Sequence, residues 1–139
     1  MLFRQLFDQT SGTYTYLLAS RRGGEAFIID PVLEKVDRYL QLIRELDVRL
    51  VKAVDTHLHA DHITGLGALR DRTQCITVMG EQSGVDVVSM RVSEGDKLEI
   101  EGVALDVLYM SLGNTADLHT SARCVATARR SLASVANIA

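Results

Sequence analysis

Thr56-His57-Leu58-His59-Ala60-Asp61-His62 is the stretch of this 139-residue sequence that points most directly to a fold and to a chemistry. Three of the chain's 4 histidines lie within it. In an extended segment alternate side chains face the same way, so His57 and His59 can approach one metal ion. Asp61 and His62 follow as the chain turns into a helix, where they can face a second metal position or a bound water. The stretch therefore predicts a metal site with His57, His59, Asp61 and His62 as its ligands.

The residue types in this stretch indicate which metals the site would take. Imidazole nitrogen and carboxylate oxygen are ligands that suit zinc, iron or manganese. A site that keeps open coordination positions makes the ion a Lewis acid or an oxygen-activating centre. Asp61 has a second possible role, because its carboxylate can hold a water molecule and act as the catalytic base. The alternative is a polar surface loop with solvated histidines, and the four-residue pattern favours the metal site over it.

The histidine stretch is expected on a loop between a strand, residues 50–54, and a helix from Gly65 to about residue 72. The segments on either side alternate strands with helices, which predicts a layered α+β sandwich. Before the loop we expect an antiparallel meander of strands and then an amphipathic helix, and after it four further strands, a Glu101-Gly102 hairpin turn and a weak helix. The expected ranges are 2–7, 13–19 and 26–29 for the meander, 36–46 for the helix, 76–79, 87–92, 97–100 and 104–109 for the later strands, and 122–135 for the weak helix.

Composition limits the number of domains and the classes of partner. A chain of this length with 47% apolar residues predicts one compact domain. The net charge of -3, from 15 basic and 18 acidic residues without a basic stripe, argues against nucleic acid as a partner. No apolar run approaches the roughly 20 residues that cross a bilayer, so we expect a cytoplasmic protein without a membrane partner. Cys75 and Cys124 show no ligand spacing, which predicts buried or incidental thiols.

The pattern His57-x-His59-x-Asp61-His62 resembles the signature of the metallo-β-lactamase superfamily. Further segments are similar to the persulfide (sulfur) dioxygenases of that superfamily, and the similarity runs from residue 1 to about residue 109. These segments are Phe3-Arg4-Gln5-Leu6-Phe7, Thr13-Tyr14-Thr15-Tyr16-Leu17-Leu18, Ile29-Asp30-Pro31-Val32 and Thr56 to Gly65.

The resemblance implies a metallo-β-lactamase-like αββα sandwich, of which residues 1–110 are the N-terminal half and residues 111–139 an atypical tail. It implies one non-haem iron, Fe(II), with zinc as the alternative metal. It also implies glutathione persulfide as the small-molecule partner, which reacts with dioxygen to give sulfite. In that family iron takes a histidine from the first motif, a later histidine and a later aspartate. His57 is the implied iron ligand, and His59, Asp61 and His62 are implied to line the site.

The tail departs from the pattern of that family. The family has Thr-Pro-Gly-His-Thr after the last strand of this half, whereas this chain has Asn114 at the position of the ligand histidine. The later Gly-Asp segment that supplies the carboxylate is also missing, which leaves His119 and Asp117 as candidates for substitute ligands. One hypothesis is that residues 111–139 are a frameshifted reading of the family's usual continuation, which the nucleotide sequence would test.

Three functions remain open at this point. The first is a persulfide dioxygenase, completed by the tail or by a second chain. The second is a truncated, inactive family member that serves as a fold remnant or an interaction module. The third is a zinc-dependent, glyoxalase II-type thioester hydrolase, in which Asp61 and His62 are direct ligands. We favour the first when function is named by family, whereas for measured turnover the missing ligands slightly favour loss of activity.

Four further expectations concern the assembly of the chain and the surroundings of the motif. Half of a two-sheet sandwich leaves an apolar face uncovered, which predicts a homodimer. Asp30 either supports the histidine loop or belongs to a plain Asp-Pro turn. Gly65 and Gly67 indicate close packing or entry into a helix, and Tyr14 and Tyr16 are expected to be sheet residues.

Overall fold

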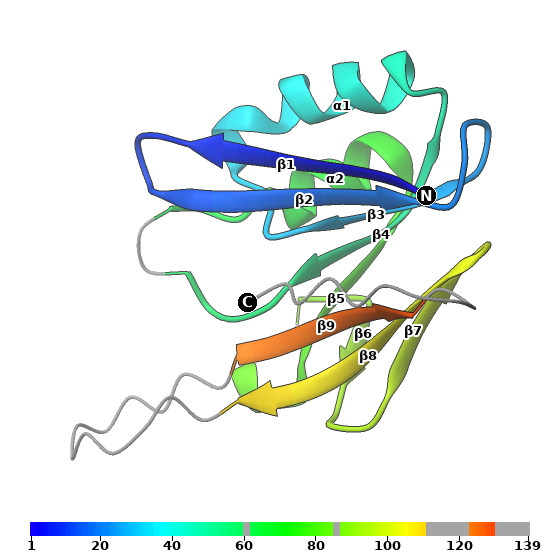
Figure 1. Cartoon of the computed structure of the whole chain (residues 1–139). Helices are drawn as coiled ribbons and strands as arrows, with labels where there is room; N and C mark the ends of the chain where they lie inside the picture. Colours follow the sequence, from blue (N-terminus) through cyan, green and yellow to red (C-terminus); the bar gives the residue numbers. More distant parts are fainter. Residues whose placement is uncertain (60–61, 85–86, 111–122, 130–139) are drawn as a thin grey trace.

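The computed structural model describes residues 1–59, 62–84, 87–110 and 123–129. Figure 1 shows the course of the chain through its strands and helices. In chain order these elements are β1 (Leu2–Asp8), β2 (Thr13–Ala19), β3 (Glu25–Ile29), a 3-10 turn η1 (Leu33–Lys35), α1 (Val36–Glu45), β4 (Arg49–Asp55), α2 (Leu66–Thr73), β5 (Ile76–Gly80), a 3-10 turn η2 (Glu81–Ser83), β6 (Met90–Val92), β7 (Lys97–Ile100), β8 (Val103–Met110) and β9 (Arg123–Arg129).

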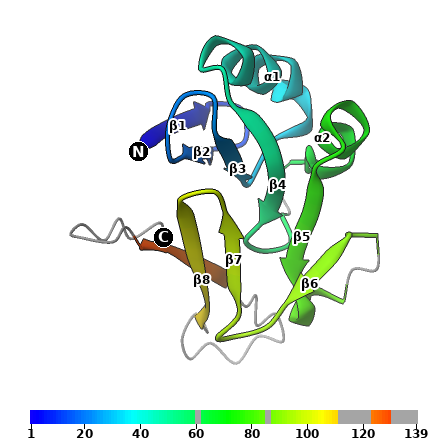
Figure 2. The same cartoon turned by 90° about the vertical axis from the view of Figure 1, so that its right-hand side faces the viewer.

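The strands form two sheets, and both helices lie on the outer face of the larger one (Figures 1 and 2). The larger sheet has the order β1-β2-β3-β4-β5-β6, and the smaller one has the order β7-β8-β9. Pairing is antiparallel from β1 to β3 and parallel from β3 to β6. The arrangement of one helical layer on two sheets confirms the predicted α+β sandwich and corresponds to part of the αββα fold.

The central strands are buried on both faces because their side chains alternate between two cores. On β2, Leu17 points into the core beneath the helices and Leu18 into the core between the sheets. On β3, Ile28 and Phe27 divide in the same way. The helical core also contains the apolar stripe of α1, and the other core is closed by Leu98, Ile100, Val103, Leu105 and Val107 of the smaller sheet.

Most of the predicted elements are confirmed, and two are not. The strand predicted at residues 87–92 begins only at Met90. The weak helix predicted at residues 122–135 is wrong for its described part, because Arg123–Arg129 forms β9. This strand pairs antiparallel with β8 over its whole length, from Met110↔Arg123 to Ala104↔Arg129. A sheet edge offers a row of backbone partners, and that tertiary pairing outweighs a weak local helix propensity.

The outer face of the smaller sheet bears on the predicted homodimer. On β7 and β8 the described outward positions are Lys97, Glu99, Ala104, Asp106 and Leu108, so charged residues predominate. The uncovered apolar face from which a homodimer was predicted is not found among these side chains, and the homodimer itself stays a prediction. Within the described part of the chain, no helix has both the length and the apolar character needed to span a bilayer.

Several strands of the larger sheet begin or end at the same side of the sheet, where the histidine loop leaves β4. The parallel strands β3 and β4 end side by side, so Asp30 and Thr56, which follow these strands, lie next to each other at their carboxyl ends. Strand β2 runs the opposite way and therefore begins there with Thr13, which pairs with Asp8 at the end of β1. Residues from four different positions in the sequence are thus brought together where the histidine loop leaves β4.

The β7–β8 hairpin turn packs against the larger sheet at Ser20. Gly102 has a φ of +74°, and a Cβ added to it would lie 2.7 Å from Cβ of Ser20. Beside this contact Arg21 donates to the Glu101 carboxylate at 2.6 Å, and the Glu101 amide donates to Glu25 at 2.9 Å. The turn therefore requires glycine both for its backbone conformation and for its close approach to the other sheet.

Gly102→Ala is expected to destabilise the protein more than Gly95→Ala. Both glycines have positive φ, but a Cβ on Gly95 would have no atom within 4 Å. The control should lose about 1–2 kcal/mol from the left-handed backbone alone. Gly102→Ala should lose at least about 1 kcal/mol more from the clash. Urea unfolding of both variants measures the difference, and equal losses would contradict the inferred close packing of the two sheets.

Candidate metal centre

The three histidines of the motif lie together on the loop between β4 and α2. The ring centroids of His57 and His59 are 4.1 Å apart, and those of His59 and His62 are 4.2 Å apart. His59 is almost fully buried, with 5% of its side chain exposed. The predicted clustering of these three residues is therefore found. Asp61, the fourth predicted ligand and predicted base, lies outside the described residues, as do Asn114, Asp117 and His119 of the tail.

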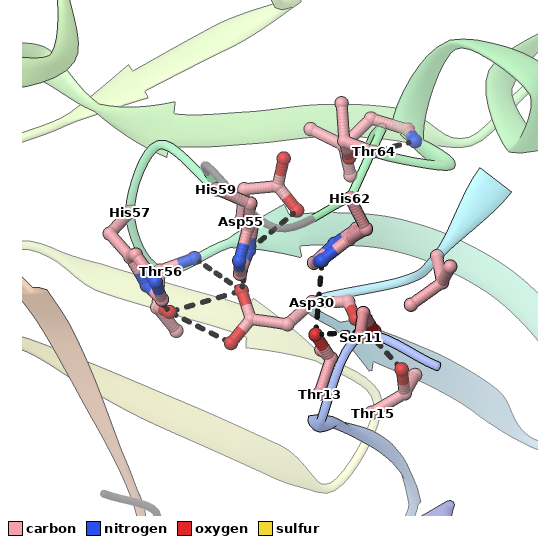
Figure 3. A network of polar contacts seen from close by, with 12 residues as sticks. Ser11, Thr13, Thr15, Asp30, Asp55, Thr56, His57, His59, His62 and Thr64 are labelled. Atoms are coloured by element: carbon pink, nitrogen blue, oxygen red, sulfur yellow. Dashed lines mark hydrogen bonds and ion pairs between the residues drawn. The ribbon is translucent and has the colours of Figure 1, made fainter. Parts of the chain in front are cut away.

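The carboxylate of Asp30 holds the start of this loop (Figure 3). Its Oδ1 accepts the Thr56 amide at 2.7 Å, and both of its oxygens contact the Thr56 hydroxyl, at 3.0 and 2.8 Å. The same Oδ1 lies 3.1 Å from Nε2 of His59. Of the two interpretations of Asp30, the structure therefore supports the one in which it anchors the histidine loop.

The backbone of Asp30 is itself unusual, with a φ of +53°. Such a left-handed conformation is tolerated by Asp better than by most residues, but it needs support from its surroundings. The Asp30 amide donates to Val54 at 2.8 Å, and its carbonyl accepts the Thr15 hydroxyl at 2.7 Å. Tyr39 of α1 contacts Thr15 at 3.0 Å and accepts the Val32 amide at 3.1 Å. Two strands and one helix thus hold Asp30 in this conformation.

Each histidine has one ring nitrogen in contact with a hydrogen-bonding partner. Nδ1 of His57 lies 2.8 Å from the Thr56 hydroxyl, and Nε2 of His59 lies 3.1 Å from Asp30. Nδ1 of His62 lies 3.0 Å from the Thr13 hydroxyl. Histidines that ligate metals usually make such an outer contact through the other nitrogen. Among the described residues His57 and His59 each have a donor atom in a group that could hold an ion such as zinc or iron, and the His62 ring lies beside that of His59.

Asp30 also lies close enough to be considered as a ligand. One donor atom each from Asp30, His57 and His59 lie within 4.8 Å of one another. The carboxylate of Asp30, however, already accepts the Thr56 amide and hydroxyl and contacts His59. We therefore interpret Asp30 as the residue that orients the histidines, with His57 and His59 as the candidate ligands.

A second carboxylate, that of Asp55, is buried directly behind His59. Its side chain is 1% exposed, and Oδ1 lies 3.8 Å from Nε2 of His59. Burial raises the pKa of Asp55 to about 7, although the hydroxyl of Thr64 lowers it. Asp55 also lines a cavity of about 200 Å³ between the loop, α2 and β5, whose other walls include Leu66 and Met79. A buried carboxyl with a raised pKa therefore lies beside His59.

The sequence did not identify Thr13, Thr15 and Asp55 as parts of the site. Thr13 and Thr15 were assigned to a strand, which is correct, but their alternation also places both hydroxyls on one face, where Thr13 contacts His62 and Thr15 donates to the Asp30 carbonyl. Asp55 ends a strand that is otherwise mostly apolar, and a carboxylate in that place was a signal that could have found it.

Gly65 allows the end of the loop to pack against the Asp30 turn. Its amide donates to the Pro31 carbonyl at 2.8 Å, and a Cβ added to it would lie 3.0 Å from Val36 and 3.3 Å from the Val32 carbonyl. Gly67, inside α2, is different, because an added Cβ would meet only the Arg70 guanidinium at 3.9 Å. Of the two expected roles, Gly65 therefore serves close packing and Gly67 lies in the helix.

Comparison with known protein families supports the metal centre. Residues 9–85 match the model of the metallo-beta-lactamase superfamily. Persulfide dioxygenase ETHE1, mitochondrial, of Mus musculus is 47% identical over 107 residues, which are 76% of this chain and 42% of that protein. The Homo sapiens protein of the same name is 46% identical over the same shares of the two chains. A hydroxyacylglutathione hydrolase of Parasynechococcus marenigrum is 34% identical over 105 residues, 73% of this chain and 39% of that protein.

Solved structures show the same fold. The crystal structure of ETHE1 from Myxococcus xanthus has a TM-score of 0.74 and 49% identity, and the match covers 78% of this chain and 48% of that one. A metallo-beta-lactamase from Staphylococcus aureus has a TM-score of 0.79 at 23% identity, covering 94% and 39% of the two chains. The matches thus cover less than half the length of the curated relatives named above.

Gly65→Ala is expected to lower stability, whereas Gly67→Ala serves as the matched control two residues away. The methyl group at residue 65 meets Val36 and a backbone carbonyl, which should cost about 1 kcal/mol or more. The methyl group at residue 67 has room in a helix and should be neutral or stabilise by up to about 1 kcal/mol. Urea unfolding measures both. Equal effects of the two substitutions would argue against tight packing at Gly65.

Asp30→Ala is expected to weaken metal binding by about 10- to 100-fold, since the loop and His59 lose their anchor. Asp30→Asn should lose less, because Asn also tolerates the left-handed backbone and keeps an oxygen for the Thr56 amide. Asp47→Ala controls for backbone strain alone, since Asp47 also has a positive φ, +52°, but is exposed and remote from the loop. Titration with Co²⁺ or Zn²⁺ measures affinity, and wild-type affinity in Asp30→Ala would refute the anchoring role.

Proposed function

Because this chain belongs to the metallo-β-lactamase superfamily, we propose that its histidine loop binds iron and serves a persulfide dioxygenase reaction. In this reaction glutathione persulfide, dioxygen and water give sulfite and glutathione. The observation that carries the proposal is the set of three adjacent histidines, each with one ring nitrogen in contact with Asp30, Thr56 or Thr13. Such a set is suited to an ion that must be held firmly and still leave positions for a substrate.

The choice of reaction is supported by the degree of similarity to named relatives. The persulfide dioxygenases are 46–47% identical to this chain over 107 residues. Four hydroxyacylglutathione hydrolases are 25–34% identical over stretches of 101 to 111 residues, and another is 39% identical over only 64 residues. The difference favours oxidation of a persulfide over hydrolysis of a thioester as the reaction to which this half of the fold is adapted.

Within the proposal the chain's own residues have separate roles. His57 is proposed as an iron ligand, with His59 and His62 beside it, and Asp61 as a ligand or as the base that holds a water. Asp30 and Thr56 fix the position of His57 and His59 through the contacts described above. When bound, iron would supply the activation of dioxygen. The further histidine and aspartate of the family pattern fall beyond residue 109, where Asn114 takes the place of the histidine.

A zinc-dependent thioester hydrolase is the second candidate, favoured by one observation. The ring of His62 lies 4.2 Å from that of His59, so a second ion could be held beside the first. Two adjacent ions activate water for attack on an ester carbonyl. An inactive family member that binds metal poorly is the third outcome, because it follows from Asn114 and the atypical tail.

Three expectations from the sequence accompany this proposal as predictions. They are a division into residues 1–110 and an atypical segment 111–139, a homodimer, and a cytoplasmic location. The first is tested by the nucleotide sequence and the second by light scattering at micromolar concentration. The third is tested by fractionation of cells, since the mammalian relatives carry the word mitochondrial in their names.

Metal content and oxygen uptake test the proposed function directly. Protein purified without chelator should contain close to one iron per chain and consume oxygen when glutathione persulfide is added. His57→Ala should remove most of the iron and the uptake, while Asp47→Ala, in an exposed turn, should change neither. Two zinc ions with thioester hydrolysis would support the hydrolase instead. Absence of both metals and both activities would show an inactive family member.

A further inference from the structure

We infer that Thr13 is a positioning residue, which sets the protonated nitrogen of His62 and thereby presents its Nε2 to the metal centre. The inference rests on the proposed metal centre and assigns a role to the β1–β2 turn, which precedes the histidine motif by more than forty residues in the sequence. Figure 3 shows Thr13 and Ser11 beneath His62, with dashed lines marking the contacts between them.

A continuous line of polar contacts joins this turn to His62. Oγ1 of Thr13 lies 3.0 Å from Nδ1 of His62, and the hydroxyl of Ser11 lies 2.9 Å from Oγ1 of Thr13. The same Ser11 hydroxyl lies 2.6 Å from the Asp8 carboxylate, which also accepts the Ser11 amide at 3.1 Å. The other oxygen of Asp8 lies 3.9 Å from Nζ of Lys35. The line therefore ends on a carboxylate with a cation beside it.

The positions of these groups are fixed by the backbone. Asp8 and Thr13 are paired residues of the β1–β2 ladder, and both are buried. The turn between them closes with a hydrogen bond from the Gly12 amide to the Asp8 carbonyl at 2.8 Å. Ser11 hydrogen bonds lower the pKa of Asp8, so this carboxylate is ionised at neutral pH and only accepts hydrogen bonds. A buried hydroxyl held in this way cannot be replaced easily by water.

The chemistry of the hydroxyl indicates the form of the His62 ring. The single proton of the Ser11 hydroxyl is shared between the Asp8 carboxylate at 2.6 Å and the Thr13 oxygen at 2.9 Å, and the Thr13 oxygen has a second lone pair that can accept Nδ1–H of His62 at 3.0 Å. A neutral imidazole carries one proton, so a proton on Nδ1 leaves the lone pair on Nε2 for a metal. The opposite tautomer would place a proton where the ligand atom is required. Thr13 thus decides whether His62 is ready to bind an ion before any ion arrives.

The experiment compares Thr13→Val, which removes the hydroxyl at nearly constant shape, with Thr13→Ser, which keeps it. Nitrogen-15 NMR of metal-free protein labelled at histidine, at a pH of about 8 where histidine is neutral, reads the tautomer of each ring. His62→Gln identifies the His62 signals by their loss. We expect Nδ1–H at His62 in the wild type and in Thr13→Ser, and its loss in Thr13→Val, with the His57 signals unchanged in all three.

Titration with Co²⁺ provides the second readout. Thr13→Val should bind cobalt about 10- to 100-fold more weakly than the wild type, and Thr13→Ser should bind it nearly as well. A wild-type His62 with its proton on Nε2, or unchanged tautomer and affinity in Thr13→Val, would overturn the inference. If Thr13→Val does not fold, Ser11→Ala replaces it and should show the same shift to a smaller degree. Failure of the wild type to bind cobalt would refute the proposed metal centre, whereas the tautomer of His62 would still test Thr13.

Discussion

The bond between the Asp30 carboxylate and the first residue of the histidine loop is the constraint on which the rest of the site depends. Asp30 adopts a left-handed backbone directly after β3, and this turns its carboxylate toward the Thr56 amide at the end of β4. The two bonds to the Thr56 hydroxyl and the contact with His59 follow from that one orientation. The Thr15 hydroxyl, itself in contact with Tyr39, donates to the Asp30 carbonyl and supports this backbone conformation. Hydrogen bonds from the fold thus offset the backbone strain at Asp30.

The order of strands explains why groups so distant in sequence meet there. In an open sheet of parallel strands the chain leaves every strand at the same edge, and an antiparallel neighbour enters at that edge. Strands β3 and β4 therefore deliver Asp30 and the histidine loop side by side, and β2 delivers Thr13 and Thr15. The two cores on either side of the larger sheet keep these strand ends from moving apart. The outer partners of the histidines thus come largely from the first thirty residues.

The described site is a histidine loop together with its supporting groups, on a chain that matches less than half the length of its curated relatives. Its geometry fits metal binding independently of which reaction follows. The proposed oxidation of a persulfide draws on similarity to those relatives, and the ligands of their pattern that lie after residue 109 distinguish an active enzyme from an inactive one. The protonation of the His62 ring also bears on the proposed reaction. A ring whose Nε2 is presented to the loop can bind either the single iron of the dioxygenase proposal or the second zinc of the hydrolase alternative.

The sequence by itself determined the family-level fold, the order of its strands and helices up to β8, and the clustering of His57, His59 and His62, because these depend on local periodicity and on a short motif. It could not decide whether Asp30 supports the loop, because an Asp-Pro turn has the same sequence in either case. Only the tertiary structure showed that Thr13 and Asp55 meet the histidines, since both depend on which strands are neighbours. The same holds for β9, where pairing with β8 overrode the weak helical pattern of the segment. Long-range strand pairing decides these features, and no local pattern of residues encodes it.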